Sequence, residues 1–264
     1  MTTVAVIGAG QMGAGIAQVA AAHGNAVLLA DIDLATANKA KAGIEKGLTK
    51  LVAKEKIAAA EAEATLARIT PVADYARFAE AAFVIEAATE REEVKRTIFE
   101  KAGAVLGVDA ILATNTSSIP ITRMAAHASD PARFIGLHFF NPVPLMPLIE
   151  VIPGLATSHE TARRTRAFAE SLGKQVVLSQ DEPGFIVNRI LLPMINEAVF
   201  VLGQGTAGVT DIDAAARLGL NHPMGPLQLA DFIGLDTCLE IVRVLHSSTG
   251  DSKYRPAPLL VKYV

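Results

Sequence analysis

A glycine-rich turn between a predicted strand and a predicted helix constrains this fold more than any other feature. Residues 8–13, Gly-Ala-Gly-Gln-Met-Gly, follow the apolar run Val4–Ile7 and open a helical pattern that stops at residues 23–25. Glycines at the first, third and sixth places permit a tight turn, close approach of backbone to a pyrophosphate, and close helix–strand packing. The helix start also offers amide groups and a favourable dipole to a phosphate. The pattern predicts a dinucleotide-binding βαβ unit, whose cofactor contacts are Gly8, Gly10, Gln11, Met12 and Gly13.

An acidic residue follows the second apolar run at the distance that this fingerprint requires. The run Ala26–Ala30 ends at Asp31, about 20 residues beyond the first glycine. A carboxylate at this place can accept hydrogen bonds from the adenosine ribose hydroxyls and would repel a 2′-phosphate. A glycine-rich turn in some other α/β protein is the alternative. The strand, the helix and the acid together favour NAD as the cofactor over NADP.

Strand and helix patterns alternate through the first two thirds of the chain. Further strands are predicted at Phe83–Ala87, Ala110–Ala113, Phe134–His138 and Val176–Leu178. This alternation indicates an α/β protein with a doubly wound parallel sheet of the Rossmann type. After residues 181–184, Asp-Glu-Pro-Gly, the pattern becomes mostly helical. We therefore expect a first domain over residues 1–182 and a second, smaller, all-helical domain over residues 183–264.

Two helical segments of the first domain allow more detailed predictions. Residues 33–66 are too long for one crossover helix, and we expect a helical pair with an apolar face formed by Ile44, Leu48, Leu51 and Val52. Lysines recur on its other face at positions 46, 50 and 54, either as a solvated face or as a rim that binds phosphate. A later helix is predicted to begin at a capping box formed by Thr157 and Glu160 and to end at Gly173.

Charge and cysteine content exclude several classes of function. A net charge of −3 and a pI near 6.1 provide no positive field for nucleic acid or an anionic membrane. The single cysteine, Cys238, excludes an internal disulfide and a cysteine-rich metal site. The histidines show no metal-ligand spacing. We expect a cytoplasmic protein without a bound metal.

The mean hydropathy of +0.35 is high, so a membrane span has to be considered. The most apolar stretch, Phe185–Leu202, is interrupted by Asn188, Arg189, Asn196 and Glu197, whereas a spanning helix needs roughly 20 predominantly apolar residues. The stretch is therefore predicted to be a buried helix. Strand-like sequence by Val4, with no basic leader and no cleavage site, also predicts that no signal peptide is present.

Polar residues stand after several predicted strands, where ligands collect in open α/β sheets. They are Thr89-Glu90, residues 115–118 (Asn-Thr-Ser-Ser), and His138 with Asn141. Each has a structural explanation when taken alone. Ser and Thr are ordinary turn formers, and His138 could be a buried core histidine.

Six segments, taken together, carry a resemblance to a known family. They are residues 114–118 (TNTSS), 136–144 (GLHFFNPVP), 148–151 (LIEV), 183–189 (PGFIVNR), 219–226 (GLNHPMGP) and 235–237 (LDT). In this order and spacing the chain resembles the L-3-hydroxyacyl-CoA dehydrogenases from residue 4 to about residue 260. The resemblance implies an oxidoreductase that interconverts (S)-3-hydroxyacyl-CoA and 3-ketoacyl-CoA with NAD(H). Short-chain substrates such as 3-hydroxybutyryl-CoA and acetoacetyl-CoA are expected.

The resemblance also implies roles for individual residues. His138 would be the catalytic base and Glu150 the carboxylate that orients it, while Ser117 and Asn188 would bind the reacting oxygens of the substrate. The positions at which the family contacts the dinucleotide are Asp31, Glu90, Lys95, Ser117 and Asn141. The chemistry of these residue types is coherent, because oxidising an alcohol needs a base for the hydroxyl proton and a neutral imidazole suits that task. A carboxylate on the other ring nitrogen fixes the tautomer and stabilises the imidazolium.

The predicted helical pair falls where the family binds coenzyme A. Lys54, with Lys50 in support, would then contact the CoA phosphates. A serine that the family can use one turn earlier corresponds to Gly47 in this chain. Family members usually continue with a basic, glycine-rich tail, so we expect that this sequence is C-terminally truncated. The apolar helical domain resembles the dimerisation region of the family, which implies a homodimer.

Two other functions are considered beside this one. A β-hydroxyacid dehydrogenase that acts on free acids shares the N-terminal fingerprint, but its Gly-x-x-x-Lys-x-x-Asn pattern does not occur here. A crystallin-like relative could bind NAD without catalysis, although the complete set of Ser117, His138, Glu150 and Asn188 argues against lost activity.

Overall fold

The computed structural model describes residues 2–264, which form two compact units. The first unit ends at Asp181, and the second covers Glu182–Val264. Among residues 2–264, no helix is both long and apolar enough to cross a membrane. The same residues contain no group of three or more His, Cys, Asp or Glu side chains that could hold a metal ion.

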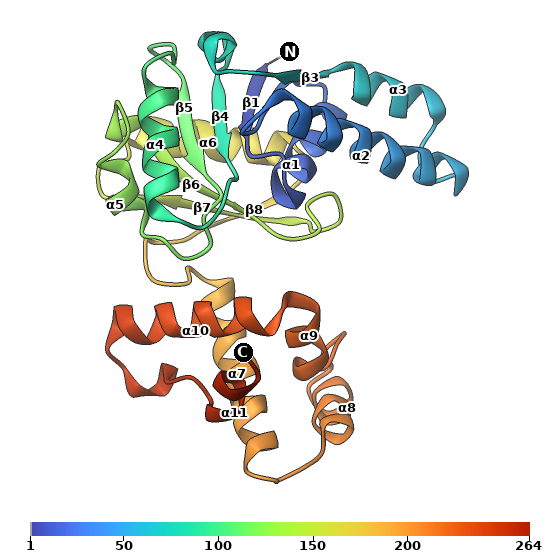
Figure 1. Cartoon of the computed structure of the whole chain (residues 1–264), viewed down its shortest axis with the longest axis vertical. Coiled ribbons are helices and arrows are strands. Elements are labelled where there is room, and N and C mark those ends of the chain that lie inside the picture. Colours follow the sequence, from blue (N-terminus) through green and yellow to red (C-terminus); the bar gives the residue numbers. More distant parts are fainter. Residues whose placement is uncertain (1) are drawn as a thin grey trace. The chain divides into compact units, whose positions relative to one another are not determined.

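The first unit is built on one eight-stranded sheet (Figure 1). Its strands are β1 (Thr3–Ile7), β2 (Ala26–Ala30), β3 (Ile69–Val72), β4 (Phe83–Glu86), β5 (Ile111–Thr114), β6 (Phe134–Phe139), β7 (Leu148–Pro153) and β8 (Gln175–Leu178). They lie in the order β3-β2-β1-β4-β5-β6-β7-β8, and every neighbouring pair is parallel except β6 and β7. The chain winds outward from β1 in both directions, so β1 and β4 flank the switch point at which such sheets bind ligands. The predicted Rossmann-type fold is confirmed.

Two strands depart from the sequence prediction. β3 was not predicted, since Pro71 lies within it, but β3 is an edge strand, where proline is tolerated. β7 runs antiparallel to β6, because residues 140–147 form a short turn in which Leu145 N and Met146 N donate to Pro142 O. A parallel connection would need a crossover of a dozen or more residues.

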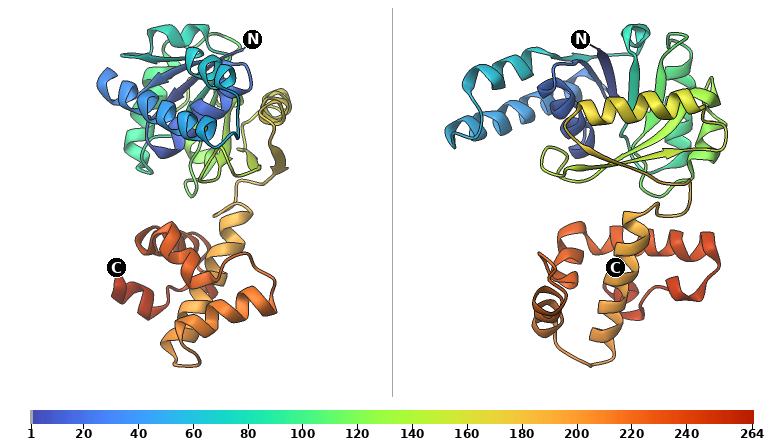
Figure 2. Two further views of the ribbon diagram at one scale, coloured as in Figure 1. Left: turned by 90° about the vertical axis from the view of Figure 1, so that its right-hand side faces the viewer. Right: turned by 180° about the vertical axis from the view of Figure 1, so that it is seen from behind.

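Helices cover both faces of the sheet. They are α1 (Gln11–Ala22), α2 (Leu34–Ala53), α3 (Ala59–Ala67), α4 (Glu92–Gly103), α5 (Ile121–Ala125) and α6 (His159–Ser171), with short 3₁₀ turns η1 (Ala76–Glu80) and η2 (Pro131–Arg133). α4 lies in front of the sheet in Figure 1, and α6 lies in front in the view from behind in Figure 2. Phe168 of α6 stacks on Phe83 of β4 with ring centroids 4.2 Å apart, and Phe99 of α4 meets Phe134 of β6 edge-on at 5.0 Å.

The segment after β2 forms α2 and α3, which pack together and extend away from the sheet (Figure 1). Ile44 and Leu48 are buried along α2, whereas the lysines at positions 46, 50 and 54 are exposed. This division matches the apolar and basic faces that the sequence predicts. The basic face is therefore accessible to a ligand from solvent.

The start of α6 corrects a prediction. Its N-cap is Ser158, whose hydroxyl accepts from Thr161 N at 3.1 Å, so the capping box of Thr157 and Glu160 is wrong. Thr157 Oγ1 instead donates to Phe134 O at 2.7 Å and accepts from Gly154 N. The hydroxyl therefore holds the segment before α6 against β6 and is not available as a helix cap. Gly173 has a φ of +69°, as expected for the residue that follows this helix.

All elements of the second unit are helical over its described residues, 182–264. They are α7 (Val187–Gly203), α8 (Val209–Gly219), α9 (Pro226–Ile233), α10 (Leu235–Thr249), the 3₁₀ turn η3 (Ser252–Tyr254) and α11 (Pro258–Tyr263). The buried side chain of Asn196 on α7 donates to Arg255 O at 3.0 Å and accepts from Ala257 N at 2.8 Å. These two bonds connect the segment before α11 to the centre of the unit. The apolar stretch Phe185–Leu202 thus contributes a packed helix, as predicted.

Candidate active site

The glycine turn between β1 and α1 has the geometry that the fingerprint requires. Gly8 has a φ of +96°, and a Cβ atom there would lie 2.6 Å from Ala87 O. A Cβ at Gly13 would overlap the carbonyl oxygen of Gly8, so only glycine allows this approach of helix to turn. At Gly10 no atom lies within 4 Å of an added Cβ. The fold requires the first and last glycines, and the open side of Gly10 leaves room for a ligand to approach the backbone.

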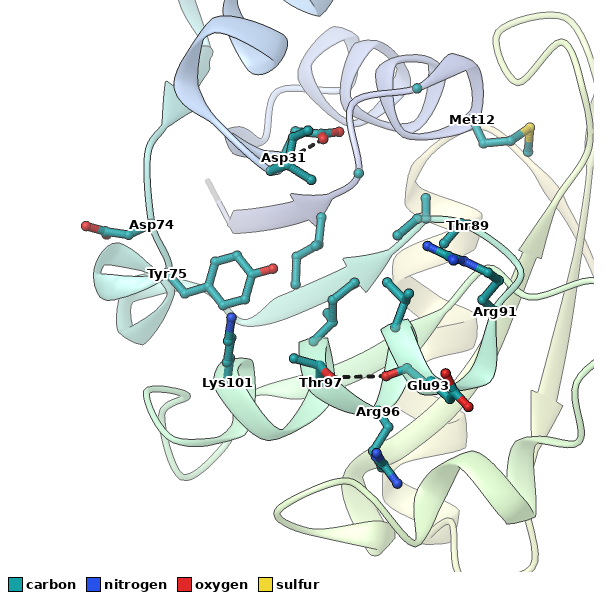
Figure 3. Close-up of a pocket in the computed structure, with 18 of the residues that line it drawn as sticks. Met12, Asp31, Asp74, Tyr75, Thr89, Arg91, Glu93, Arg96, Thr97 and Lys101 are labelled. Atoms are coloured by element: carbon teal, nitrogen blue, oxygen red, sulfur yellow. Dashed lines mark hydrogen bonds between the residues drawn. The ribbon is translucent and has the colours of Figure 1, made fainter.

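A crevice with a volume of about 1440 Å³ opens beside this turn, at the carboxyl ends of β1, β2 and β4 (Figure 3). Gly10, Gln11 and Met12 line it on one side, and Thr89 and Arg91 line it on the other. It extends between the two halves of the sheet, where doubly wound folds bind dinucleotides. The residues present therefore fit an elongated cofactor with a pyrophosphate at the start of α1.

Asp31 lies at one end of this crevice and is fixed by the glycine turn. One carboxylate oxygen accepts a hydrogen bond from Ala9 N, and the other accepts from Ile32 N at 2.7 Å. Neighbouring Asp33 is the N-cap of α2, and its bond from Thr36 N holds the pKa of its carboxyl below the ordinary value. Asp31 therefore stands where an adenosine ribose would bind, with Asp33 two residues further along the chain, which fits NAD and opposes a 2′-phosphate.

Tyr75 is a lining residue that sequence reasoning missed. Its hydroxyl points into the crevice (Figure 3), and its ring stacks on Phe78 with centroids 4.7 Å apart. Burial raises the pKa of Tyr75 to about 12, with further contributions from the charges of Asp31 and Glu86. The hydroxyl therefore stays protonated and can donate a hydrogen bond to a ligand. A lone tyrosine before a short 3₁₀ turn gave no pattern from which this position could be predicted.

His138 and Glu150 meet across the antiparallel strands β6 and β7. They are paired in the strand register, and His138 Nδ1 lies 2.7 Å from Glu150 Oε2. Both side chains are buried, with exposed fractions of 6% and 0%. Because a carboxylate can only accept, Nδ1 donates and Nε2 is the nitrogen that can take a proton. The contact between His138 and Glu150 that the family resemblance implies is therefore present.

Glu90 connects the ends of β4 and β5. Its Oε1 accepts from Thr116 Oγ1 at 2.6 Å and Ser117 N at 2.8 Å, and it also contacts the hydroxyls of Ser117 and Ser118 at 3.2 and 3.1 Å. Burial acts to raise the pKa of Glu90, but the charge of Lys95 and these hydrogen bonds outweigh it and hold the pKa below its ordinary value. Glu90 is therefore an ionised acceptor beside Ser117.

The remaining predicted site residues lie at different depths. Lys95 is buried on α4, and its ammonium contacts Glu86 and Glu90. Asn141 lies in the exposed turn after β6, which Lys174 secures by donating from Nζ to Val143 O and Met146 O, each at 2.7 Å. Asn188 is buried near the start of α7, in the second unit. The dinucleotide contacts of Lys95 and Asn141 and the substrate contact of Asn188 stay predictions.

The fold and the crevice define a class of protein. An open sheet with a G-x-G-x-x-G turn, an acid after β2, and a buried histidine–carboxylate pair in the same unit are typical of a nicotinamide-dependent dehydrogenase. Residues 3–182 match the family described as 3-hydroxyacyl-CoA dehydrogenase, NAD binding domain, and residues 184–264 match 3-hydroxyacyl-CoA dehydrogenase, C-terminal domain. The chain belongs to the 3-hydroxyacyl-CoA dehydrogenase family, and its cofactor is NAD.

Full-length relatives support this assignment. The 3-hydroxybutyryl-CoA dehydrogenase of Bradyrhizobium diazoefficiens is 54% identical over 261 residues, which are 99% of this chain and 89% of that protein. A probable 3-hydroxybutyryl-CoA dehydrogenase of Deinococcus radiodurans is 52% identical over 98% of this chain and 93% of its own length. Among solved structures, the (S)-3-hydroxybutyryl-CoA dehydrogenase of Ralstonia eutropha superposes with a TM-score of 0.97 at 47% identity, over 99% of this chain and 93% of that one.

Proposed function

We propose that this dehydrogenase interconverts (S)-3-hydroxybutyryl-CoA and acetoacetyl-CoA with NAD(H), using His138 as its base. The observation that carries the proposal is the buried contact between His138 and Glu150 at 2.7 Å, in the unit that holds the cofactor crevice. The full-length similarity to proteins named 3-hydroxybutyryl-CoA dehydrogenase supports the short-chain substrate. It also argues against an enzyme that acts on free acids and against an NAD-binding protein without catalysis.

The proposed mechanism divides the work between the side chains of the site. When bound, NAD⁺ supplies the hydride acceptor, and NADH supplies the donor for the reverse reaction. His138 Nε2 takes the proton of the 3-hydroxyl, and Glu150 stabilises the imidazolium that results. Ser117 and Asn188 hold the reacting oxygens of the substrate, which aligns the hydride-bearing carbon with the cofactor. In reduction of the ketone, His138 returns the proton.

The proposal is tested by the dependence of NADH oxidation on the substrate. Purified protein should oxidise NADH with acetoacetyl-CoA and should show at most about 1% of that kcat/KM with free acetoacetate, because the CoA moiety provides binding energy that positions the ketone. Activity with free acetoacetate equal to that with the thioester would contradict the CoA substrate. NADH binding without turnover of either compound would contradict catalysis.

We further propose that Lys54, with help from Lys50, binds the phosphates of CoA. Both side chains are exposed on α2, and Lys54 is the residue that caps its C-terminus. At Gly47, one turn before Lys50, nothing lies within 4 Å of an added Cβ, so the basic face has an open gap where the family can carry a serine. An open cationic face of this kind suits a phosphate-bearing ligand.

Lys54→Glu should raise KM for acetoacetyl-CoA about 2- to 5-fold at low salt, the size expected for an exposed ion pair. The effect should shrink at high salt, since the Debye length is about 10 Å at 0.1 M ionic strength. An N-acetylcysteamine thioester lacks the phosphates and should show an unchanged KM. Lys39→Glu is the charge-matched control, because Lys39 is exposed on the same helix but about 22 Å away along its axis. Equal changes with both thioesters would contradict the CoA contact.

The helical unit is proposed to form a homodimer. It exposes several large apolar side chains, namely Ile190, Val209, Leu218, Leu220 and Phe232, and the homodimer that the family resemblance implies would have such side chains to bury. Sedimentation at micromolar concentration would reveal the dimer, and a monomer under those conditions would contradict it. We also propose a cytoplasmic location, which fits a single, buried cysteine with no disulfide to maintain.

A further inference from the structure

A buried carboxylate that the proposed mechanism does not use lies directly beneath the site. Glu86 ends the apolar strand β4 and has an exposed fraction of 0%. Its oxygens accept from Ala88 N at 2.7 Å, Thr114 Oγ1 at 2.6 Å and Lys95 Nζ at 2.8 Å. Burying an ionised carboxylate is costly unless it is paired and hydrogen-bonded in this way. A leucine at this position would pack in β4 without that cost, so the charge itself needs an explanation.

The contacts of Glu86 lead through one ammonium to the site. Lys95 Nζ is 2.8 Å from both oxygens of Glu86 and 3.5 Å from Glu90 Oε2. Glu90 in turn accepts from the backbone and hydroxyl of Ser117 through its other oxygen. Two carboxylates thus share one cation, and Glu86, Lys95 and Glu90 together carry a net charge of −1.

The unequal distances show where this excess charge resides. The ammonium of Lys95 is centred on Glu86 and lies farther from Glu90. The side chain of Glu90 is 39% exposed, whereas that of Lys95 is 1% exposed. Glu86 therefore draws Lys95 away from Glu90 Oε2. Glu90, the one member of the three that is exposed to solvent, is therefore the carboxylate whose charge Lys95 compensates less.

The contact of Glu90 with Ser117 indicates which part of the cofactor this charge lies near. Glu90 does not itself line the crevice, although Thr89 and Arg91 on either side of it do, and its carboxylate contacts the backbone and hydroxyl of Ser117. Asp31 occupies the adenosine end, beside the glycine turn. The proposed function places the nicotinamide near Ser117 and His138, so Glu90 faces the part of the cofactor whose charge changes in the reaction.

We propose that Glu86 is a positioning residue that sets the preference of the site for oxidised over reduced cofactor. By holding Lys95 off Glu90, it leaves a net negative charge beside the nicotinamide, which is cationic in NAD⁺ and neutral in NADH. This inference rests on the proposed function for the placement of the nicotinamide. Because the charge acts within a partly buried site, removing it should change the ratio of the two dissociation constants about 3- to 10-fold.

Three variants test the proposal by calorimetric measurement of Kd for NAD⁺ and for NADH, without acyl-CoA. Glu86→Gln raises the net charge of residues 86, 90 and 95 together from −1 to 0. The ratio of Kd for NAD⁺ to Kd for NADH should therefore rise about 3- to 10-fold. Lys95→Met removes the cation and should lower that ratio. Thr114→Val is the matched control, because it removes a hydrogen bond to the same carboxylate without changing charge, and its ratio should equal that of wild type.

The decisive result is that the ratio of dissociation constants shifts in opposite directions in Glu86→Gln and Lys95→Met. Loosening of the core would instead weaken the binding of NAD⁺ and of NADH together. If Glu86→Gln does not fold, Lys95→Met alone still has to lower the ratio. A ratio unchanged in every charge variant that folds, or shifted equally in Glu86→Gln and Thr114→Val, would overturn the proposal. If the ratio changes with charge as expected but the protein is inactive on acetoacetyl-CoA, the proposed function is refuted and this inference stands. If the wild type binds neither NAD⁺ nor NADH, both are refuted.

Discussion

Glu150→Gln should lower kcat for acetoacetyl-CoA reduction almost as much as His138→Ala, although only the histidine is proposed to exchange a proton with substrate. Positioned general acid–base catalysis typically contributes about 10²–10⁴-fold, which is the loss expected for His138→Ala. The amide introduced by Glu150→Gln could still accept from Nδ1 but could not stabilise an imidazolium. Glu150 is fully buried and paired with His138 in the strand register, so it has the geometry to control the ring.

The losses should appear in kcat and leave the Kd of NADH within about twofold of the wild-type value, because neither residue is among those lining the crevice. Glu170→Gln is a suitable control, since it neutralises an exposed carboxylate of α6 that pairs only with Arg166 among the described residues. A parallel loss of NADH affinity in the two site variants would indicate a general disturbance of the first unit.

The second large effect expected is discrimination between NAD and NADP. With NADH the wild-type kcat/KM should exceed that with NADPH by about 10²-fold, because Asp31 would lie against a phosphate of the same sign. Asp31→Asn should lower the ratio of kcat/KM with NADH to kcat/KM with NADPH about tenfold. The amide removes the charge, while its oxygen can still accept from Ala9 N.

Asp33→Asn provides the comparison. Asn is as good an N-cap as Asp, so α2 should keep its start while one neighbouring charge is lost. Its effect on the cofactor ratio should be clearly smaller than that of Asp31→Asn. Equal or better use of NADPH by the wild type would contradict the role of Asp31.

The parts of the fold that were predictable are those that short-range physics imposes. Gly8 and Gly13 occupy positions where a side chain would collide with backbone, and their spacing, together with the flanking strand, the helix and Asp31, indicated the first βαβ unit. The alternation of apolar strands and helices indicated the layers. β3 was missed, because a four-residue strand containing Pro71 has no strand pattern of its own and forms only against the exposed edge of β2.

Details that depend on tertiary partners were not predictable. Thr157 resembles a helix cap in sequence, but its hydroxyl donates to Phe134 O, a partner 23 residues away. Ser158 is the N-cap of α6 instead. At the site, the meeting of His138 with Glu150 could be anticipated from the family resemblance. The sharing of Lys95 between Glu86 and Glu90 could not, although a carboxylate ending an apolar strand is a signal that could have marked Glu86.

The double variant His138→Ala/Glu150→Gln tests the central claim most directly, because groups that act as one unit have non-additive effects. We expect its kcat for acetoacetyl-CoA reduction to lie within about threefold of that of His138→Ala alone. With the imidazole gone, Glu150 has no proton transfer left to support. Fully multiplicative losses in the double variant, or a Glu150→Gln enzyme within about threefold of wild type, would contradict the histidine–carboxylate pair as the proton-transfer unit.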